Sequence, residues 1–196
     1  MPNEQITIRT RDGECTLRIA TPAADGSWPA VIFYMDAGGI RPAVIEMAQR
    51  LADAGYVVLL PDLFYRYGAY GPFVPKEVFA GDFRAILGPL MATTGNDKAA
   101  EDTEAFLGSL HARGDVAGRK VGAVGFCMGG GMALGAAGTY PDRFGAVVSF
   151  HAAILRPTRQ PAPTCWLRGW GPRSILPLPR TTAAIRLRWQ SDLRTP

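Results

Sequence analysis

Residues 121–131 have the sequence VGAVGFCMGGG, in which an apolar run meets a cluster of glycines around one thiol. This pattern predicts a nucleophile elbow, G-x-nucleophile-x-G, where a buried strand turns sharply into a helix and exposes the nucleophile at the turn. Small residues are needed two positions before and two after the nucleophile, here Gly125 and Gly129, because strand and helix pass too close for a side chain. We therefore expect Cys127 to be a nucleophile.

A cysteine gains reactivity at this position. The free N–H groups and the dipole at the start of a helix favour the thiolate, which is the reactive form. The alternative is that Cys127 is an inert, buried cysteine in a glycine-rich turn, since free cysteine is among the most buried residue types. The strand, the glycines and the helix all fall where the motif requires them, which favours the elbow.

The composition is typical of a globular protein of 196 residues, with 47% hydrophobic and 10% aromatic residues. The cysteines at 15, 127 and 165 form neither a metal-ligand spacing nor a disulfide framework, so we expect no metal, no cofactor and a reducing, cytoplasmic location. The first ten residues lack the apolar segment of a signal peptide. Residues 121–141 are uncharged and long enough to span a bilayer, but their seven glycines and strand-like start argue against a membrane segment.

The formal net charge of +4 is unevenly distributed. Residues 1–154 hold 13 Lys and Arg against 16 Asp and Glu, whereas residues 155–196 hold eight Arg, no Lys and one acidic residue, Asp192. These last 42 residues also contain seven prolines and show no alternation of strand and helix patterns. We expect a core at 1–154 and an irregular Arg/Pro-rich tail at 155–196, either disordered or translated out of frame from about residue 152–156. The alternative is a natural basic tail that binds nucleic acid or an acidic partner; we expect no nucleic-acid partner.

Hydrophobic periodicity predicts the order of elements along the core. An Asp-Gly turn between two alternating runs, 4–10 and 15–20, predicts a β-hairpin. Alternation of the later elements predicts an α/β fold, with an open, mostly parallel sheet and helices on both faces. The expected buried strands are 30–35, 56–61, 120–126 and 144–150, and helices are expected at 42–54 and 128–138. Residues 62–91 are expected to form an irregular excursion with one short helix around 76–87.

A further helix is expected to be capped by Asn96 or Asp97 and to run to about residue 112. The residues expected on its inward face are Ala99, Ala100, Phe106, Leu107 and Leu110.

Three segments closely resemble the dienelactone hydrolase (carboxymethylenebutenolidase-like) family of the α/β-hydrolase superfamily. They are YMDAGGIRP at 34–42, LADAGYVVLLPDLFYR at 51–66 and GFCMGG at 125–130. The resemblance covers about residues 4–154, and the cysteine at the elbow is its most specific element, because most α/β hydrolases use serine there. It implies an α/β-hydrolase fold, C-terminally incomplete in this chain, and the hydrolysis of small ester or lactone substrates.

The resemblance also implies roles for residues around the thiol. Cys127 would attack the carbonyl carbon and form a thioester, while the backbone N–H groups of Met128 and Ala37 would hold the oxyanion. Asp36 occupies the place of an acidic side chain that similar enzymes carry near the thiol. The alternative role of Asp36 is that of a turn residue that accepts backbone hydrogen bonds.

Three further residues are candidates for substrate binding. Arg66 and Arg84 are suited to bidentate pairing with a substrate carboxylate, although exposed arginines commonly have no such role. His151 follows a predicted strand and would line the rim of the pocket or make only a local hydrogen bond.

We find no triad acid and no triad histidine, which this fold places on loops after later strands. His111 precedes the nucleophile, and no histidine follows His151. The sequence therefore predicts a cysteine-dependent hydrolase or, alternatively, a catalytically incomplete family member, either a pseudoenzyme or a frameshifted product.

Overall fold

A computed structural model of the chain describes residues 3–71 and 73–150. Its central element is one six-stranded sheet. The strands follow the order β1-β2-β4-β3-β5-β6 across the sheet. The elements, in chain order, are β1 (Asn3–Thr10), β2 (Gly13–Ala20), β3 (Ala30–Tyr34), α1 (Pro42–Asp53), β4 (Val57–Pro61), α2 (Pro75–Ala80), α3 (Phe83–Met91), α4 (Asn96–His111), β5 (Val121–Phe126), α5 (Met128–Thr139) and β6 (Phe144–Phe150).

The predicted N-terminal hairpin is confirmed. β1 pairs with β2 in antiparallel register, with Ile6 opposite Leu17, and the turn ends at Gly13, whose φ of +145° suits glycine. β2 then pairs with β4, also in antiparallel register, so the hairpin extends one edge of the sheet.

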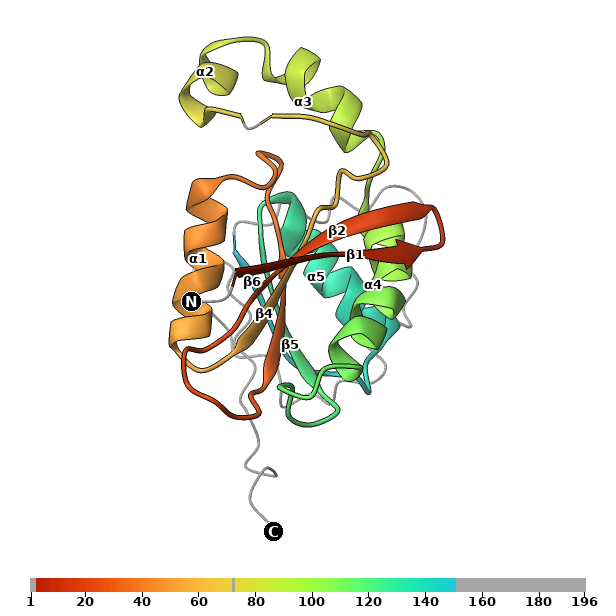
Figure 1. Cartoon of the computed structure of the whole chain (residues 1–196). Coiled ribbons are helices and arrows are strands. Elements are labelled where there is room, and N and C mark those ends of the chain that lie inside the picture. The colour runs from red at the N-terminus through yellow and green to blue at the C-terminus, as the bar shows by residue number, and fades with distance from the viewer. Residues whose placement is uncertain (1–2, 72, 151–196) are drawn as a thin grey trace, which may run out of the picture.

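The four remaining strands form the predicted parallel set. β4 and β5 flank β3, and β6 pairs with β5, each in parallel register. Every residue of β4 is buried, as expected for a strand covered on both faces. Figure 1 shows α1 on one face and α4 and α5 on the other, which confirms the predicted α/β architecture.

The uncharged run at 121–141 does not form one long helix. It divides into β5 and the 12-residue helix α5. In the part of the chain that the structure describes, we find no helix whose length and apolar character would let it cross a membrane.

The segment 76–87 departs from the prediction of a single helix. The first helix, α2, ends before Gly81, and a second, α3, begins after Asp82. The Asp82 side chain accepts hydrogen bonds from the backbone N–H groups of Arg84 and Ala85 and thereby caps α3. Gly81 therefore ends one helix and Asp82 caps the next. This local signal is hidden when the periodicity of the whole segment is considered.

The predicted helix α4 is confirmed, but its N-cap is not. Gly95 holds this position without a side-chain cap, whereas the sequence predicts Asn96 or Asp97 as the cap. The residues predicted to face inward are all buried, namely Ala99, Ala100, Phe106, Leu107 and Leu110. The tail at 155–196 and His151 lie outside the described residues.

Candidate active site

Cys127 lies at the junction of β5 and α5, as the motif predicts. Strand β5 ends at Phe126, helix α5 begins at Met128, and Cys127 between them has φ +52° and ψ −117°. Among the described residues it is the only non-glycine with positive φ. Such a conformation is strained for a residue with a side chain and is typical of a nucleophile held at a sharp turn.

The two glycines of the motif are required sterically. A Cβ at Gly125 would collide with the backbone carbonyl of Gly129, four residues further along the chain. A Cβ at Gly129 would collide with the carbonyl oxygens of Tyr34 and Met35. The turn therefore depends on both glycines, and the start of α5 packs directly against the chain leaving β3.

Cys127 is fixed by its backbone and half-buried. Its N–H donates to the Phe150 carbonyl at 2.9 Å, and its own carbonyl accepts from the N–H of Gly130 at 3.1 Å. The preceding residue, Phe126, stacks on Phe33 and on Phe150, with ring centroids 5.5 and 4.8 Å apart. These three rings connect β3, β5 and β6 beside the thiol, a support that the sequence pattern did not predict.

Two backbone donors are free near this turn. Met128 is the first residue of α5, and Ala37 lies in the loop between β3 and α1, the loop that packs against the start of α5 at Gly129. Neither N–H donates a hydrogen bond within the described part of the chain. Both therefore remain available to an external acceptor.

Asp36 is occupied within its own loop. Its carboxylate accepts two hydrogen bonds from the Arg41 guanidinium, at 2.6 and 2.8 Å, and one from the N–H of Gly38 at 2.9 Å. The side-chain bonds to Asp36 raise the pKa of Arg41. Among the described residues no hydrogen bond joins Asp36 to Cys127, and its partners fit the alternative of a turn-forming acid. The sequence signal for this ion pair was Arg41, five positions after Asp36 in the same predicted loop region.

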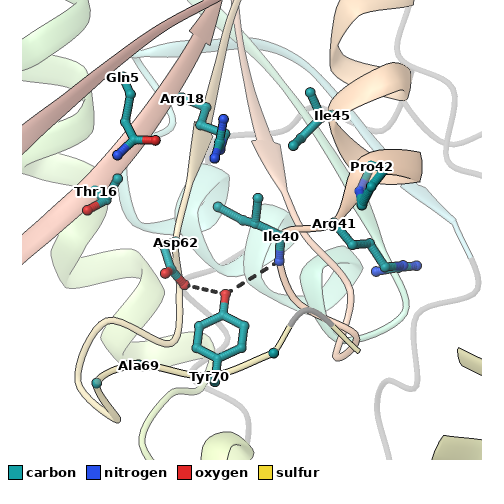
Figure 2. A pocket seen from close by; sticks show the side chains of 12 residues that line it. Gln5, Thr16, Arg18, Ile40, Arg41, Pro42, Ile45, Asp62, Ala69 and Tyr70 are labelled. Carbon is teal, nitrogen blue, oxygen red and sulfur yellow. Dashed lines mark hydrogen bonds between the residues drawn. The ribbon is translucent and has the colours of Figure 1, made fainter. Parts of the chain in front are cut away.

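A tyrosine holds the same loop from the other side. The Tyr70 hydroxyl donates to Asp62 at 2.7 Å and accepts from the N–H of Ile40 at 3.4 Å (Figure 2). The Tyr70 ring also packs against Gly39, where a Cβ would collide with it. Burial raises the pKa of Asp62, despite the hydrogen bond that it accepts from Tyr70. These contacts of Tyr70 could not be predicted, because Tyr70 lies in a segment without periodicity.

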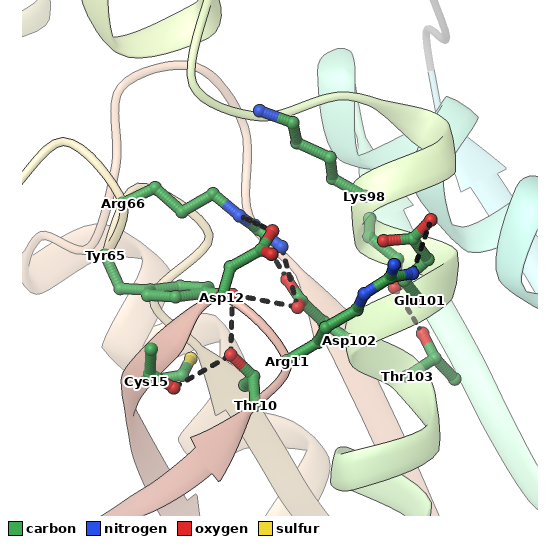
Figure 3. Close-up of polar contacts among 12 residues, drawn as sticks. Thr10, Arg11, Asp12, Cys15, Tyr65, Arg66, Lys98, Glu101, Asp102 and Thr103 are labelled. Atoms are coloured by element: carbon green, nitrogen blue, oxygen red, sulfur yellow. Dashed lines mark hydrogen bonds and ion pairs between the residues drawn. The ribbon is translucent and has the colours of Figure 1, made fainter.

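Arg66 binds two carboxylates of the protein itself. Its Nε donates to Asp12 at 2.6 Å, and its two terminal nitrogens donate to Asp102 at 2.9 and 2.8 Å (Figure 3). The side chains of Arg66 and Asp102 are only 8% and 1% exposed, and the Tyr65 hydroxyl also donates to Asp102. Arg66 thus ties the chain after β4 to the hairpin and α4, which does not favour the expected substrate-binding role.

Arg84 shows no interaction that would assign it to the elbow. It is an exposed residue of α3, with its guanidinium carbon 5.9 Å from the centre of the Phe83 ring. No described contact connects it to Cys127. The structure therefore places Met128 at the turn and the start of the Ala37 loop against Gly129, whereas Arg66 is paired with Asp12 and Asp102.

Known proteins resemble both the sequence and the structure. The pattern of the dienelactone hydrolase family matches residues 16–165. Carboxymethylenebutenolidase of Pseudomonas putida is 28% identical over 150 residues, which cover 73% of this chain and 59% of that protein. This chain spans about half the length of the curated relatives that it matches.

Solved structures show the same fold. Dienelactone hydrolase from Anabaena variabilis superposes with a TM-score of 0.51 at 24% identity, covering 76% of this chain and 62% of that one. A dienelactone hydrolase-like promiscuous phosphotriesterase, P91, from metagenomic libraries gives a TM-score of 0.56 at 27% identity, with 78% and 60% covered. The family match over most of the chain, together with the elbow and its sheet, shows that this chain belongs to the dienelactone hydrolase family of α/β hydrolases.

Proposed function

We propose that this chain hydrolyses small esters or lactones with Cys127 as the nucleophile. The observation that carries the proposal is the strained backbone of Cys127 at the strand–helix junction, with two free N–H donors nearby. Strain at a single residue persists only where the surrounding structure enforces it, and such residues cluster at active sites. The name of the Pseudomonas putida relative, carboxymethylenebutenolidase, supports a lactone among the substrates.

The reaction divides into two steps. The Cys127 sulfur forms a bond to the carbonyl carbon, and the oxyanion is held by the N–H groups of Met128 and Ala37. The carbon–oxygen bond of the ester then breaks, and the leaving oxygen takes up the proton that the Cys127 thiol has lost and departs as an alcohol. For a lactone, this hydroxyl stays on the acyl chain. Water then attacks the thioester and releases the acid, which restores the thiol.

The need for a general base in the second step, hydrolysis of the thioester, favours an alternative function. Attack by water needs a general base, and within this chain no histidine follows His151 and the only later acid is Asp192. The alternative is therefore a catalytically incomplete family member that forms the thioester and hydrolyses it slowly.

The free thiols of Cys15 and Cys127 support a reducing, cytoplasmic setting for either function.

Thiol labelling combined with ester turnover tests the proposal. The experiment uses a Cys165→Ser background, because Cys165 lies outside the described residues. Cys15 is fully buried, and burial raises its pKa to about 12, so the folded protein should not label there. We expect iodoacetamide to modify one thiol in this background and none after Cys127→Ala, and we expect 4-nitrophenyl butyrate hydrolysis only with Cys127 present.

The outcomes separate the two functions. Sustained turnover that is lost with Cys127→Ala supports the hydrolase. One labelled thiol with a single burst of nitrophenol and no further turnover supports the incomplete enzyme. Turnover that survives Cys127→Ala would remove Cys127 from the mechanism.

A further inference from the structure

A cavity of about 430 Å³ lies between the hairpin, the start of α1 and the loop after β4 (Figure 2). Its polar lining includes Gln5, Thr16, Arg18 and Asp62, and its apolar lining includes Ile40 and Ile45. Neither Cys127 nor the residues on either side of it line this cavity. It is therefore separate from the elbow, although Ile40 belongs to the loop that also contains Ala37.

Arg18 is a cation of this cavity that has no ion-pair partner among the described residues. It lies on β2 directly opposite Gln5 of β1 in the hairpin register. Over the described ranges 3–71 and 73–150, no carboxylate forms an ion pair with it. Arg41 also lines the cavity, but its guanidinium is held by Asp36, and Figure 2 shows it directed away from Arg18. A half-buried guanidinium without a partner is suited to an external anion.

Asp62 supplies the complementary group. One of its carboxylate oxygens, Oδ1, accepts from both the Tyr70 hydroxyl at 2.7 Å and the N–H of Phe64 at 3.0 Å. The other oxygen, Oδ2, accepts no hydrogen bond from the described residues. The cavity thus offers a cation with free donors, an acceptor with a free lone pair, and an apolar wall. In an apolar pocket, a small number of polar groups fixes the orientation of a small ligand.

We propose that this cavity binds a small hydroxy acid. The carboxylate of the ligand pairs with Arg18, its hydroxyl donates to Asp62 Oδ2, and its carbon chain packs against Ile40 and Ile45. Ring opening of a lactone produces such a molecule, so the site would hold a product of the proposed reaction. That connection rests on the proposed function, whereas the binding itself does not.

Calorimetric titration of the full chain with 4-hydroxybutyrate tests the proposal. We expect Arg18→Met to weaken binding by about tenfold or more, because a charge-assisted hydrogen bond is lost. Arg9→Met is the matched control, because Arg9 is an exposed arginine of the same hairpin outside this cavity. It should bind as the parent does.

A second variant guards against misfolding of the first. Gln5→Glu places a carboxylate directly opposite Arg18, which should pair with it, preserve the hairpin and exclude the ligand. A thermal melt confirms that each variant is folded. Butyrate, which lacks the hydroxyl, and 4-hydroxybutyramide, which lacks the carboxylate, should each bind more weakly than 4-hydroxybutyrate.

Three results would overturn the proposal: no binding by the folded parent chain, equal affinity in Arg18→Met and the parent, or equal affinity for butyrate and 4-hydroxybutyrate. The Cys127→Ala variant separates this site from the reaction. If the parent chain shows no turnover but 4-hydroxybutyrate still binds to Cys127→Ala, the proposed function fails and the binding site stands.

Discussion

Gly129→Ala is expected to distort the strand–helix turn at Cys127 and to destabilise the fold by about 1–3 kcal/mol, as overpacking of a closed site does. The added methyl group would meet the carbonyl oxygens of Tyr34 and Met35, which are backbone atoms of the central strand region and have little room to move. Because a domain is stable by only about 5–15 kcal/mol, this loss is large. Urea unfolding measures the stability, and the rate of iodoacetamide labelling reports whether Cys127 is still presented.

Gly108→Ala is the matched control for this prediction. Gly108 lies in α4, is exposed, and has no atom within 4 Å of the position that a Cβ would take. Alanine is the better helix former, by about 1 kcal/mol, so this variant should be at least as stable as the parent. A Gly129→Ala protein as stable as Gly108→Ala, with unchanged labelling, would show that the elbow tolerates a side chain at this position.

Asp102→Ala is expected to cost about 3–5 kcal/mol of unfolding free energy, because it leaves the buried guanidinium of Arg66 without its main partner. Asp12 would remain as the single carboxylate on Arg66, and the Tyr65 hydroxyl would lose an acceptor. Chemical denaturation of the parent and the variant measures the difference.

The comparison pair for this test is fully on the surface. Arg50 and Glu46 form an ion pair on α1 with side chains 75% and 65% exposed, and Glu46→Ala should change stability by no more than about 0.5 kcal/mol. Replacing both buried partners with apolar residues, Arg66→Met with Asp102→Leu, should recover part of the loss. If Asp102→Ala costs no more than Glu46→Ala, the buried pair does not stabilise the fold.

Most of the fold was predictable because its signals are local. The hairpin follows from Asp-Gly between alternating runs, and the parallel strands follow from continuous apolar runs. The exception is residues 76–87, where Gly81 and Asp82 end one helix and cap the next within two positions. A window long enough to detect helical periodicity averages over that boundary.

The candidate site divides in the same way. The elbow was predictable, because Gly125, Cys127 and Gly129 form a local sequence pattern at the end of an apolar run. The partners of Arg66 were not, because Asp102 lies 36 residues further along the chain and only the fold brings the two together. One signal was present: Asp102 shares its helix face with Ala99 and Phe106, and an acid on an apolar face requires a buried cation.

At Cys127, folding and the proposed nucleophilic role make opposite demands on one residue. A side chain in that backbone conformation costs about 1–3 kcal/mol, and glycine is the residue that would relieve the cost. Glycine would also delete the thiol. The chain therefore retains at this turn a conformation that opposes its own stability, and a search for stabilising substitutions that ignored function would select Cys127→Gly early.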